Sequence, residues 1–496
     1  MSDQKEAKTT TVATEQQEES SLLDQILNKG MRARDEEQAK RNRDLVTDFV
    51  KEIMQGQLKL DKNLETSINE RIKQIDALIS AQLNEIMHHK DFQKLEGSWR
   101  GLRHLVYESE TGVMLKIKVM NVTKKDLLRD LERAPEFDQS TLFKKVHDEG
   151  FGVFGGEPFG ALIGDYEFDC GNQDVAMLAK VAEVAAAAHA PFISAASPHM
   201  FGWDAFTQLG DVRDLAMTFD QVEYVEWRSF RESEDSRYVG LTLPHTLMRL
   251  PYGDDTVPTE SFKFKEDVDG RDHGKYLWGN AAYSFGTRLT EAFAMHNWCV
   301  AIRGVEGGGL VPGLPAHKFK TDEGETALKC PTEIAITDRR EKEFSDLGFI
   351  PLVHCKNTDY AAFFGAQSCN KAGKYDKDAA NANARLSTQL QYMFAVSRFA
   401  HYLKAIMRDK VGDFMSRTDC ERFLNQWIHN YVTEDDTAAP NIKAKFPLRE
   451  ARVDVVDVPG KPGVYRAVAF LRPHFQLDEI TVSLRLVAEL PKRASK

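Results

Sequence analysis

The stretch that decides the fold is residues 449–490, REARVDVVDVPGKPGVYRAVAFLRPHFQLDEITVSLRLVAEL. It predicts three long strands in a row: residues 451–458, then residues 464–471 after the turn PGKPG, then residues 479–490 after a break at Pro473-His474. In the last strand apolar and polar side chains alternate, with Val487 as the exception. Successive side chains of a strand point to opposite faces, so the pattern predicts a half-buried antiparallel meander.

A sheet of only three strands is marginally stable, and its edges carry unpaired N–H and C=O groups. We therefore expect further strands beside it. They can come from the same chain, which is the commoner case, or from another chain by strand addition.

Composition places the chain among water-soluble folded proteins. It has 496 residues, of which 42% are hydrophobic and 28% charged, enough for two or three domains. The net charge of −11 argues against nucleic acid as a partner, because phosphate binding needs a basic surface. No apolar run is long enough to span a bilayer, so we expect no direct membrane insertion.

The chain start and the cysteines indicate a cytoplasmic protein. Residues 1–6 contain no apolar segment of the kind that a signal peptide requires. The six cysteines form no CxxC pair, and in a chain of this size they are typical of reduced, buried thiols.

Residues 1–42 are predicted to be a disordered tail that carries one short amphipathic helix, residues 21–30. Its apolar face would consist of Leu22, Leu23, Ile26 and Leu27. This helix either docks on its own domain or is a tethered peptide for the groove of another protein.

Helical patterns dominate the next region, residues 43–110. Isoleucine and leucine recur every three or four residues from 64 to 86, as one stripe of a long helix requires. The stripe must cover the core of this chain, which is the default, or a partner helix. In the following helix, residues 92–107, Gly97 and Gly101 predict close approach of another element.

The middle of the chain has α/β character. A strand at 159–168, a helix at 173–189 and a strand at 191–196 predict a βαβ unit. Further strands are predicted at 113–122, 298–302, 333–336 and 349–355, and a single long helix at 378–410.

One motif looks catalytic. Gly150-Phe151-Gly152-Val153-Phe154-Gly155 is a formal G-x-G-x-x-G, but a dinucleotide site needs a strand before it and a helix after it. Here a helix precedes and a strand follows, so packing and turns explain the glycines better. A nucleotide-binding α/β enzyme using this loop stays the alternative function.

The sequence contains no other motif of a catalytic, metal or cofactor site. There is no HExxH, no phosphate loop and no G-x-S-x-G elbow, so we predict no catalytic residue, no metal and no cofactor. The prediction is that the protein is not an enzyme.

Several segments resemble the large subunit of the contractile sheath of the type VI secretion system. They are KLEGSWRGL (94–102), FGVFGGEPFGALIGDYEF (151–168), PFISAASPHMFG (191–202), LMRLPYG (247–253), WCVAIRGVEGGGLVPGLP (298–315) and EIAITDRREKEFS (333–345). The resemblance covers about residues 90–490.

The resemblance implies a fold similar to phage tail-sheath proteins: an α+β chain with a mixed α/β body at 111–445 and C-terminal strands at 446–496. It implies an obligate small sheath subunit, further copies of the chain in a helical cylinder, an inner tube protein, a baseplate and an AAA+ unfoldase that acts after contraction. The unfoldase would grip Leu22, Leu23, Ile26 and Leu27. Strands shared between subunits would use these residues: Val464, Arg466, Val468, Phe470, Ile480, Val482, Leu484 and Leu486.

Overall fold

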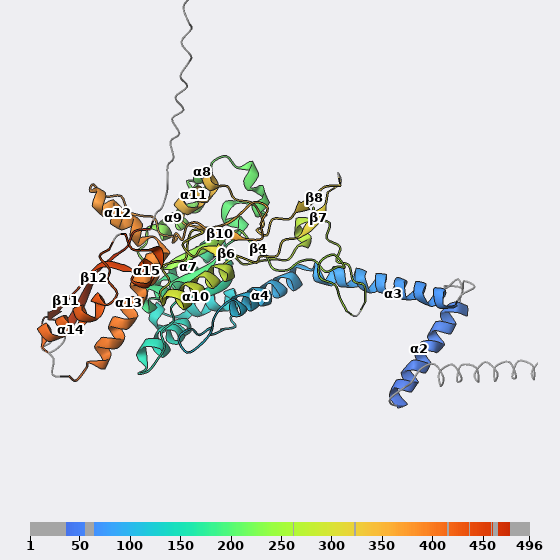
Figure 1. Cartoon of the computed structure of the whole chain (residues 1–496), viewed down its shortest axis with the longest axis horizontal. Helices are drawn as coiled ribbons and strands as arrows, with labels where there is room; N and C mark the ends of the chain where they lie inside the picture. The colour runs from blue at the N-terminus through green and yellow to red at the C-terminus, as the bar shows by residue number, and fades with distance from the viewer. Residues whose placement is uncertain are drawn as a thin grey trace, which may run out of the picture. The chain divides into compact units, whose positions relative to one another are not determined.

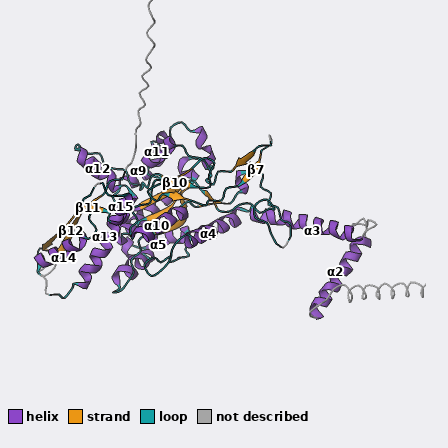
Figure 2. Ribbon diagram, in the orientation of Figure 1, coloured by secondary structure: helices purple, strands orange, loops and turns teal. Residues whose placement is uncertain are grey.

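The computed structural model describes residues 36–54, 64–260, 262–321, 324–413, 416–435, 437–457, 459 and 465–476. The chain divides into two units, and the division falls within helix α3. The first comprises residues up to Leu83 with residues 260–264, and the second comprises all the rest. Figure 1 shows the course of the chain, and Figure 2 shows strands in the middle of the second unit with helices around them.

The first unit contains helix α2 (Glu36–Met54) and most of α3 (Leu64–Met87). Helix α2 begins at Glu36, within the segment predicted to be a disordered tail. Ile68, Ile72, Ile75 and Ile79 of α3 are exposed. Within the described residues nothing covers this stripe, and both predicted partners, the core of the chain and a helix of another protein, stay open.

The second unit is built on a six-stranded mixed sheet of order β1-β2-β3-β9-β10-β6. Its strands are β1 (Leu162–Phe168), β2 (Phe192–Ala196), β3 (Val239–Leu243), β6 (Leu310–Val311), β9 (Ile350–His354) and β10 (Ala361–Phe363). The first four in spatial order are parallel, and β10 runs antiparallel to both of its neighbours.

Helices cover both faces of this sheet. Helix α7 (Asn172–Ala188) joins β1 to β2, which confirms the predicted βαβ unit. It packs with Phe192 in one apolar core, while Ile193, which points to the opposite face, lies in a second core with α10 (Ala282–His296).

The remaining helices and strands surround this centre. The helices are α4 (Lys90–Tyr107), α5 (Lys124–Arg133), α6 (Thr141–Phe143), the π-helix η2 (Lys144–Gly152), α8 (Leu215–Phe219), α9 (Val225–Glu232), α11 (Asp338–Asp346), α12 (Asp378–Ser387), α13 (Leu390–Asp409), α14 (Arg417–His429) and α15 (Pro440–Lys445). The strands are β4 (Thr246–Leu247), β5 (Trp278–Gly279), β7 (Lys318–Lys320), β8 (Thr326–Leu328), β11 (Leu448–Asp457) and β12 (Tyr465–Pro473).

Three predicted strands are wrong. Residues 113–122, 298–302 and 333–336 are irregular. No described strand pairs with the first two, and the third makes a backbone–backbone hydrogen bond only at its start, where the Glu333 amide donates to the His245 carbonyl next to β4. Apolar side chains bury the second segment without a ladder; the Trp298 ring, for example, stacks on Phe399 with centroids 4.3 Å apart.

The single helix predicted at 378–410 is two helices, α12 and α13. Between them the backbone turns aside to pair with a neighbouring segment. The amide of Ser368 donates to the carbonyl of Thr388, and the amide of Leu390 donates to the carbonyl of Ala366, each at 2.8 Å. These bonds replace the helical ones that a continuous helix would make.

Candidate assembly surfaces

The C-terminal hairpin has one buried face. Strands β11 and β12 are antiparallel, with Val453 opposite Ala469. Ala451, Val453 and Val455 of β11 are buried in a third apolar core that also contains residues of α13 and α14. The first two strands of the predicted meander are thus present, and the third, residues 479–490, lies outside the described residues.

Helix α14 closes the outer edge of β11. The Asn425 side chain donates from Nδ2 to the Val453 carbonyl at 2.7 Å and accepts from the Val453 amide at 2.9 Å through Oδ1. The Val455 amide donates to Glu421 Oε2 at 3.4 Å. Side chains therefore take the place of a neighbouring strand, and no further strand can pair here.

The outer edge of β12 has no such cover within the described residues. Residues of an antiparallel pair alternate between bonding each other and pointing outward. The backbone N–H and C=O of Val453 point away from β12, toward Asn425, so the N–H and C=O of its opposite residue Ala469 point away from β11. The same holds for Ala467, which lies opposite Val455. The described hairpin can accept a strand only at this edge.

The solvent face of the hairpin carries three of the predicted strand-pairing residues. Arg466, Val468 and Phe470 are exposed, and the Arg452 guanidinium lies 4.9 Å from the centroid of the Phe470 ring. The other predicted site residues lie outside the described residues: Leu22, Leu23, Ile26, Leu27, Val464, Ile480, Val482, Leu484 and Leu486.

Gln476, which no sequence motif indicates, hydrogen-bonds the chain to the body just after β12. Its backbone amide donates to the Tyr392 hydroxyl at 3.1 Å. Its side-chain Nε2 donates to the Val300 carbonyl at 3.1 Å, and its side-chain Oε1 accepts from Arg303 Nε at 3.0 Å. The described chain after β12 is therefore held at a defined point on the body. Nothing in the local sequence signals these long-range bonds.

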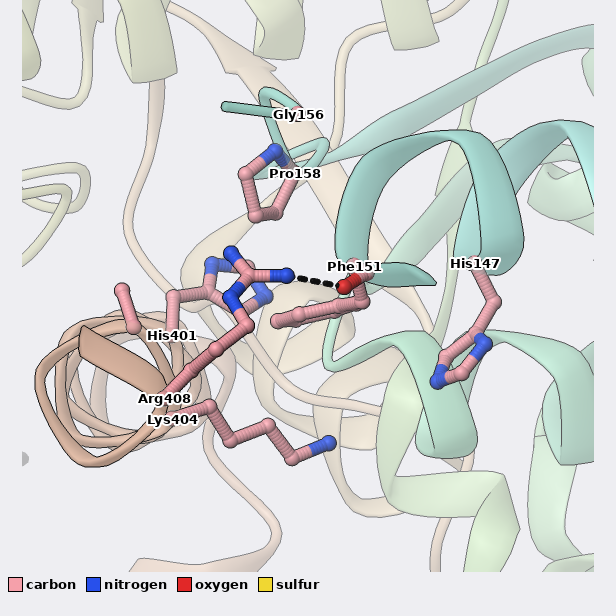
Figure 3. A pocket seen from close by; sticks show the side chains of 8 residues that line it. His147, Phe151, Gly156, Pro158, His401, Lys404 and Arg408 are labelled. Atoms are coloured by element: carbon pink, nitrogen blue, oxygen red, sulfur yellow. Dashed lines mark hydrogen bonds between the residues drawn. The ribbon is translucent and has the colours of Figure 1, made fainter. Parts of the chain in front are cut away.

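The glycine loop lies beside a small pocket rather than at a helix N-terminus. The pocket, of about 180 Å³, lies between η2 and α13 (Figure 3). Gly150 and Gly152 are inside the π-helix, and a Cβ on Gly156 would lie 2.4 Å from the Gly150 carbonyl oxygen. The glycines serve close backbone packing, so they form no phosphate cradle.

The pocket is lined by cationic and imidazole groups. His401 Nε2 donates to the Ala188 carbonyl at 2.9 Å, and Arg408 donates to the Phe151 carbonyl. Burial lowers the pKa of His401 to about 4, so its imidazole is neutral at pH 7. The lining includes no carboxylate to act as its catalytic partner.

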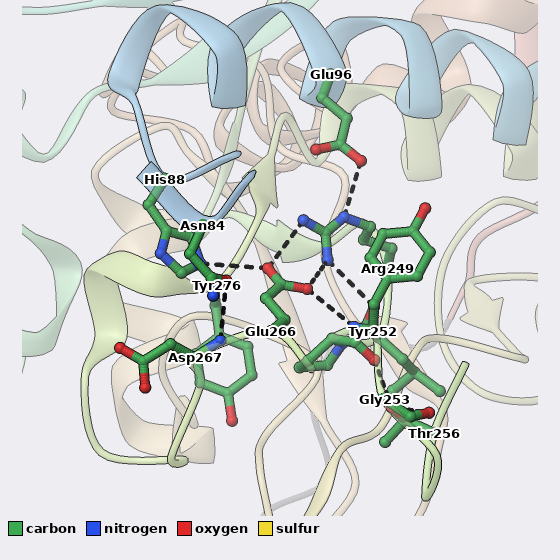
Figure 4. Close-up of polar contacts among 12 residues, drawn as sticks. Asn84, His88, Glu96, Arg249, Tyr252, Gly253, Thr256, Glu266, Asp267 and Tyr276 are labelled. Carbon is green, nitrogen blue, oxygen red and sulfur yellow. Dashed lines mark hydrogen bonds and ion pairs between the residues drawn. The ribbon is translucent and has the colours of Figure 1, made fainter. Parts of the chain in front are cut away.

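A buried polar network fastens the loop after β4 to the start of α4 (Figure 4). Arg249 donates to both oxygens of Glu266, at 2.6 and 3.0 Å, and from Nε to Glu96 Oε1 at 2.8 Å. The Tyr252 backbone amide donates to Glu266 Oε2 at 2.9 Å, and Nε2 of the His88 imidazole lies 3.3 Å from Glu266 Oε1. The Arg249–Glu266 pair is thus bidentate and further hydrogen-bonded, as a buried ion pair requires for stability.

A second buried cluster surrounds His245, whose ring nitrogens lie 3.0 Å from Glu167 Oε1 and 2.5 Å from Glu333 Oε2. Burial opposes its charge, but the hydrogen bonds to both carboxylates outweigh burial and raise the pKa of His245 to about 10. Burial would raise the pKa of Glu333, but its hydrogen bonds to His245 and His273 outweigh burial and lower that pKa to about 2. His245 and Glu333 are therefore both charged near pH 7, so the cluster is an ion pair there and not a proton-transfer site.

Metal and membrane features are also missing from the described part of the chain. Among those residues, no three His, Cys, Asp or Glu side chains are grouped to hold a metal ion. None of the helices described combines the length and the apolar character needed to cross a membrane.

Comparison with known proteins shows the family of this chain. Residues 69–370 match the VipB family, described as EvpB/VC_A0108, tail sheath N-terminal domain, and residues 379–490 match the EvpB/VC_A0108, tail sheath gpW/gp25-like domain. The chain is 52% identical over 428 residues, 86% of both chains, to the type VI secretion system sheath protein TssC1 of Pseudomonas aeruginosa.

Two solved structures are also similar. One is a chain of the anti-feeding prophage baseplate, with a TM-score of 0.39 and 9% identity over 75% of this chain and 83% of that chain. The other is a chain of the anti-feeding prophage helical sheath in the contracted state, with a TM-score of 0.29 and 10% identity over 75% of this chain and 84% of that chain.

The family is structural, so the prediction of a non-enzymatic protein is confirmed and the nucleotide-binding alternative is wrong. The sheath to which it contributes assembles in the cytoplasm, as predicted. With both family matches and the close relative in agreement, the chain belongs to the VipB family of tail sheath proteins, as a large subunit of the type VI secretion system contractile sheath.

Proposed function

We propose that this chain forms an obligate heterodimer with a small sheath subunit, and that strands added at the β12 edge join neighbouring heterodimers into a hollow cylinder. The cylinder surrounds an inner tube protein and starts from a baseplate. The observation that carries the proposal is the asymmetry of the hairpin. Asn425 and Glu421 occupy the β11 edge, while Ala467 and Ala469 of β12 have no described partner for their outward backbone groups.

The exposed stripe of α3 also supports an obligate partner. An apolar helix face that the chain's own described residues leave exposed is typical of a protein–protein contact.

Strand sharing suits a contracting sheath. During contraction subunits would move as nearly rigid bodies into larger interfaces and release free energy by burying apolar surface. A backbone ladder keeps neighbours joined during that motion, because its hydrogen bonds do not depend on the shape of the surrounding surface. The bonds of Gln476 would transmit the pull from the shared strands to the body.

The test removes one outward amide and leaves the hairpin's own ladder intact. In Ala469→Pro the missing N–H points away from β11, and proline is tolerated at such edge positions. We expect the co-expressed pair to fold and associate but to form no cylinders in electron micrographs, whereas Ala469→Ser forms them. Cylinders of normal length from Ala469→Pro would contradict strand addition at this edge.

A further inference from the structure

A second surface of the chain is built like the inside of an interface. Helix α4 is apolar on two opposite sides. On one side Gly97, Gly101 and Leu105 are buried, and the helix packs against α10. At 3.6 residues per turn, the opposite side is formed by four large apolar side chains, all of them exposed: Phe92, Leu95, Trp99 and Val106.

Trp99 is the most informative of these side chains. Its indole is 65% exposed in the middle of a well-formed helix. Tryptophan, tyrosine and arginine are enriched among the residues that dominate binding energy, and a large exposed apolar patch marks an interaction surface. Within the described part of the chain nothing covers this side.

The apolar side of α4 continues into residues 113–121, the segment whose sequence alternates like a strand. Val106 of α4 and Val119 of the segment line the same groove, which has a volume of about 530 Å³. Val113, Met114, Val119 and Met120 are exposed. Helix and segment therefore form one surface, which we call the α4–113 surface.

Side-chain contacts fasten the segment to the body. Leu115 and Ile117 are half-buried, Lys116 and Lys118 pair with Glu157, and the Tyr166 hydroxyl donates to the Val122 carbonyl at 2.8 Å. Nearly all of its backbone groups lack a protein partner within the described residues. In the described structure the amides of residues 113–121 donate to no protein group, and among their carbonyls only that of Leu115 accepts a bond, from Gly112. A held, strand-patterned segment with free backbone groups is a template for strand addition.

The size of the surface fits a stable complex. With Tyr107 at the end of α4 included, nine large apolar or aromatic side chains of α4 and the segment each expose at least 39% of their surface. A group of exposed apolar side chains of this number is typical of a protein–protein contact, to which each partner contributes roughly 800 Å².

Charge argues against a second copy of this chain as the occupant. Antiparallel self-pairing centred on Ile117 would place Lys116 directly opposite Lys118 of the other copy. Like charges at such positions are destabilising. A different chain with acidic or neutral residues there avoids this repulsion.

We propose that the small sheath subunit covers the α4–113 surface, packing apolar side chains on the Trp99 side of α4 and adding a strand along residues 113–121. This inference rests on the proposed function, because it assigns to this surface the partner named there. It is separate from the β12 edge, which joins neighbouring heterodimers.

The first experiment compares two double variants with matched exposure. Val113→Lys with Met114→Lys changes side chains that are 87% and 69% exposed, and Val222→Lys with Met217→Lys changes side chains that are 85% and 69% exposed elsewhere. We expect the first pair to weaken binding of the purified small subunit about 30-fold or more, as loss of central interface contacts does. The control pair should change it less than twofold. Equal affinities of the two variants would overturn the proposal.

The second experiment needs no variant, so misfolding cannot confuse it. Amide hydrogen exchange is measured for the full chain alone and for the complex. We expect residues 113–121 to exchange freely in the chain alone and at least tenfold more slowly in the complex. Unchanged exchange in the complex overturns strand addition. Protection already present in the chain alone overturns the choice of partner, with a second copy indicated if protection rises with concentration and a segment of the same chain if it does not.

Failure of the proposed function is distinguishable from failure of this inference. If the unaltered chain does not bind the small subunit, both are wrong. If it binds and forms cylinders while the Lys variant binds equally well, only the α4–113 surface is wrong.

Discussion

At the scale of single residues, Gly101 shows how a missing side chain positions a helix. A Cβ at this position would lie 2.3 Å from Cδ2 of Tyr283, a buried ring of α10. A Cβ on Gly97 would lie 3.2 Å from the Trp278 carbonyl oxygen. The predicted close approach at these two glycines is confirmed, and it holds one side of α4 against the body so that the other side faces outward.

His401 carries a prediction about acid stability. Its imidazole is 4% exposed and stays neutral in the fold, because burial holds its pKa at about 4 instead of 6.5. Between these pH values the unfolded chain binds a proton that the folded chain does not, so stability falls as the pH drops from 6.5 to 4. A single such group destabilises by roughly 3 kcal/mol over that window.

We therefore expect His401→Gln, whose amide can still donate to the Ala188 carbonyl, to lose less stability than the unaltered chain between pH 6.5 and 4. Urea unfolding at several pH values measures this slope. Some slope remains, because burial also lowers the pKa of His189 to about 4. The exposed His199→Gln is the control, and a variant slope equal to that of the control would contradict the assignment.

At the scale of elements, whether an apolar segment becomes a strand depends on its neighbours. Residues 239–243 (VGLTL) form β3 in the centre of the sheet, although no strand was predicted there. Gly240 accounts for its tight fit, because a Cβ would lie 2.8 Å from the side chains of Ile350 and Leu390. Residues 113–122 have the clearer alternation, yet they are irregular in this chain alone.

Asn425 carries the element-scale prediction. Its side-chain amide hydrogen-bonds both the N–H and the C=O of Val453, a residue that is fully buried. In Asn425→Ala these groups lose their partners, and each unsatisfied buried group costs about 1–3 kcal/mol. We expect the free energy of unfolding to fall by about 2–4 kcal/mol.

The exposed Asn430, at the C-terminus of α14, is the matched control. Chemical unfolding of Asn430→Ala should differ from the unaltered chain by less than about 0.5 kcal/mol. In Asn425→Ala the Val453 amide should also exchange faster with solvent. If that amide stayed protected, another group would be closing the β11 edge.

At the scale of the whole molecule, the described chain leaves three surfaces that none of its described residues covers. They are the β12 edge, the α3 stripe and the α4–113 surface. A subunit that polymerises with copies of itself has to keep such surfaces uncovered until assembly.

The N-terminal helix predicted at 21–30 carries the prediction at this scale. We propose that Leu22, Leu23, Ile26 and Leu27 are the handle that an AAA+ unfoldase grips after contraction. Leu23→Asp together with Ile26→Asp places charges on the apolar face, which a hydrophobic groove rejects. We expect normal cylinders and loss of unfoldase binding, measured by pull-down from contracted sheaths. Unchanged unfoldase affinity, with Leu23→Met and Ile26→Val as the conservative control, would refute the handle.

The sequence by itself determined the local elements and the family. Periods of two and 3.6 are written in consecutive side chains, so the hairpin strands β11 and β12, the βαβ unit and most helices followed from pattern alone. Only the tertiary structure decided the rest: the break at 388–390, the central place of β3, the Gln476 anchor and which hairpin edge stays open. The physical reason is that burial and backbone pairing depend on groups far away in the chain. Asn425 reaches Val453 across 28 positions, and no local pattern encodes that contact.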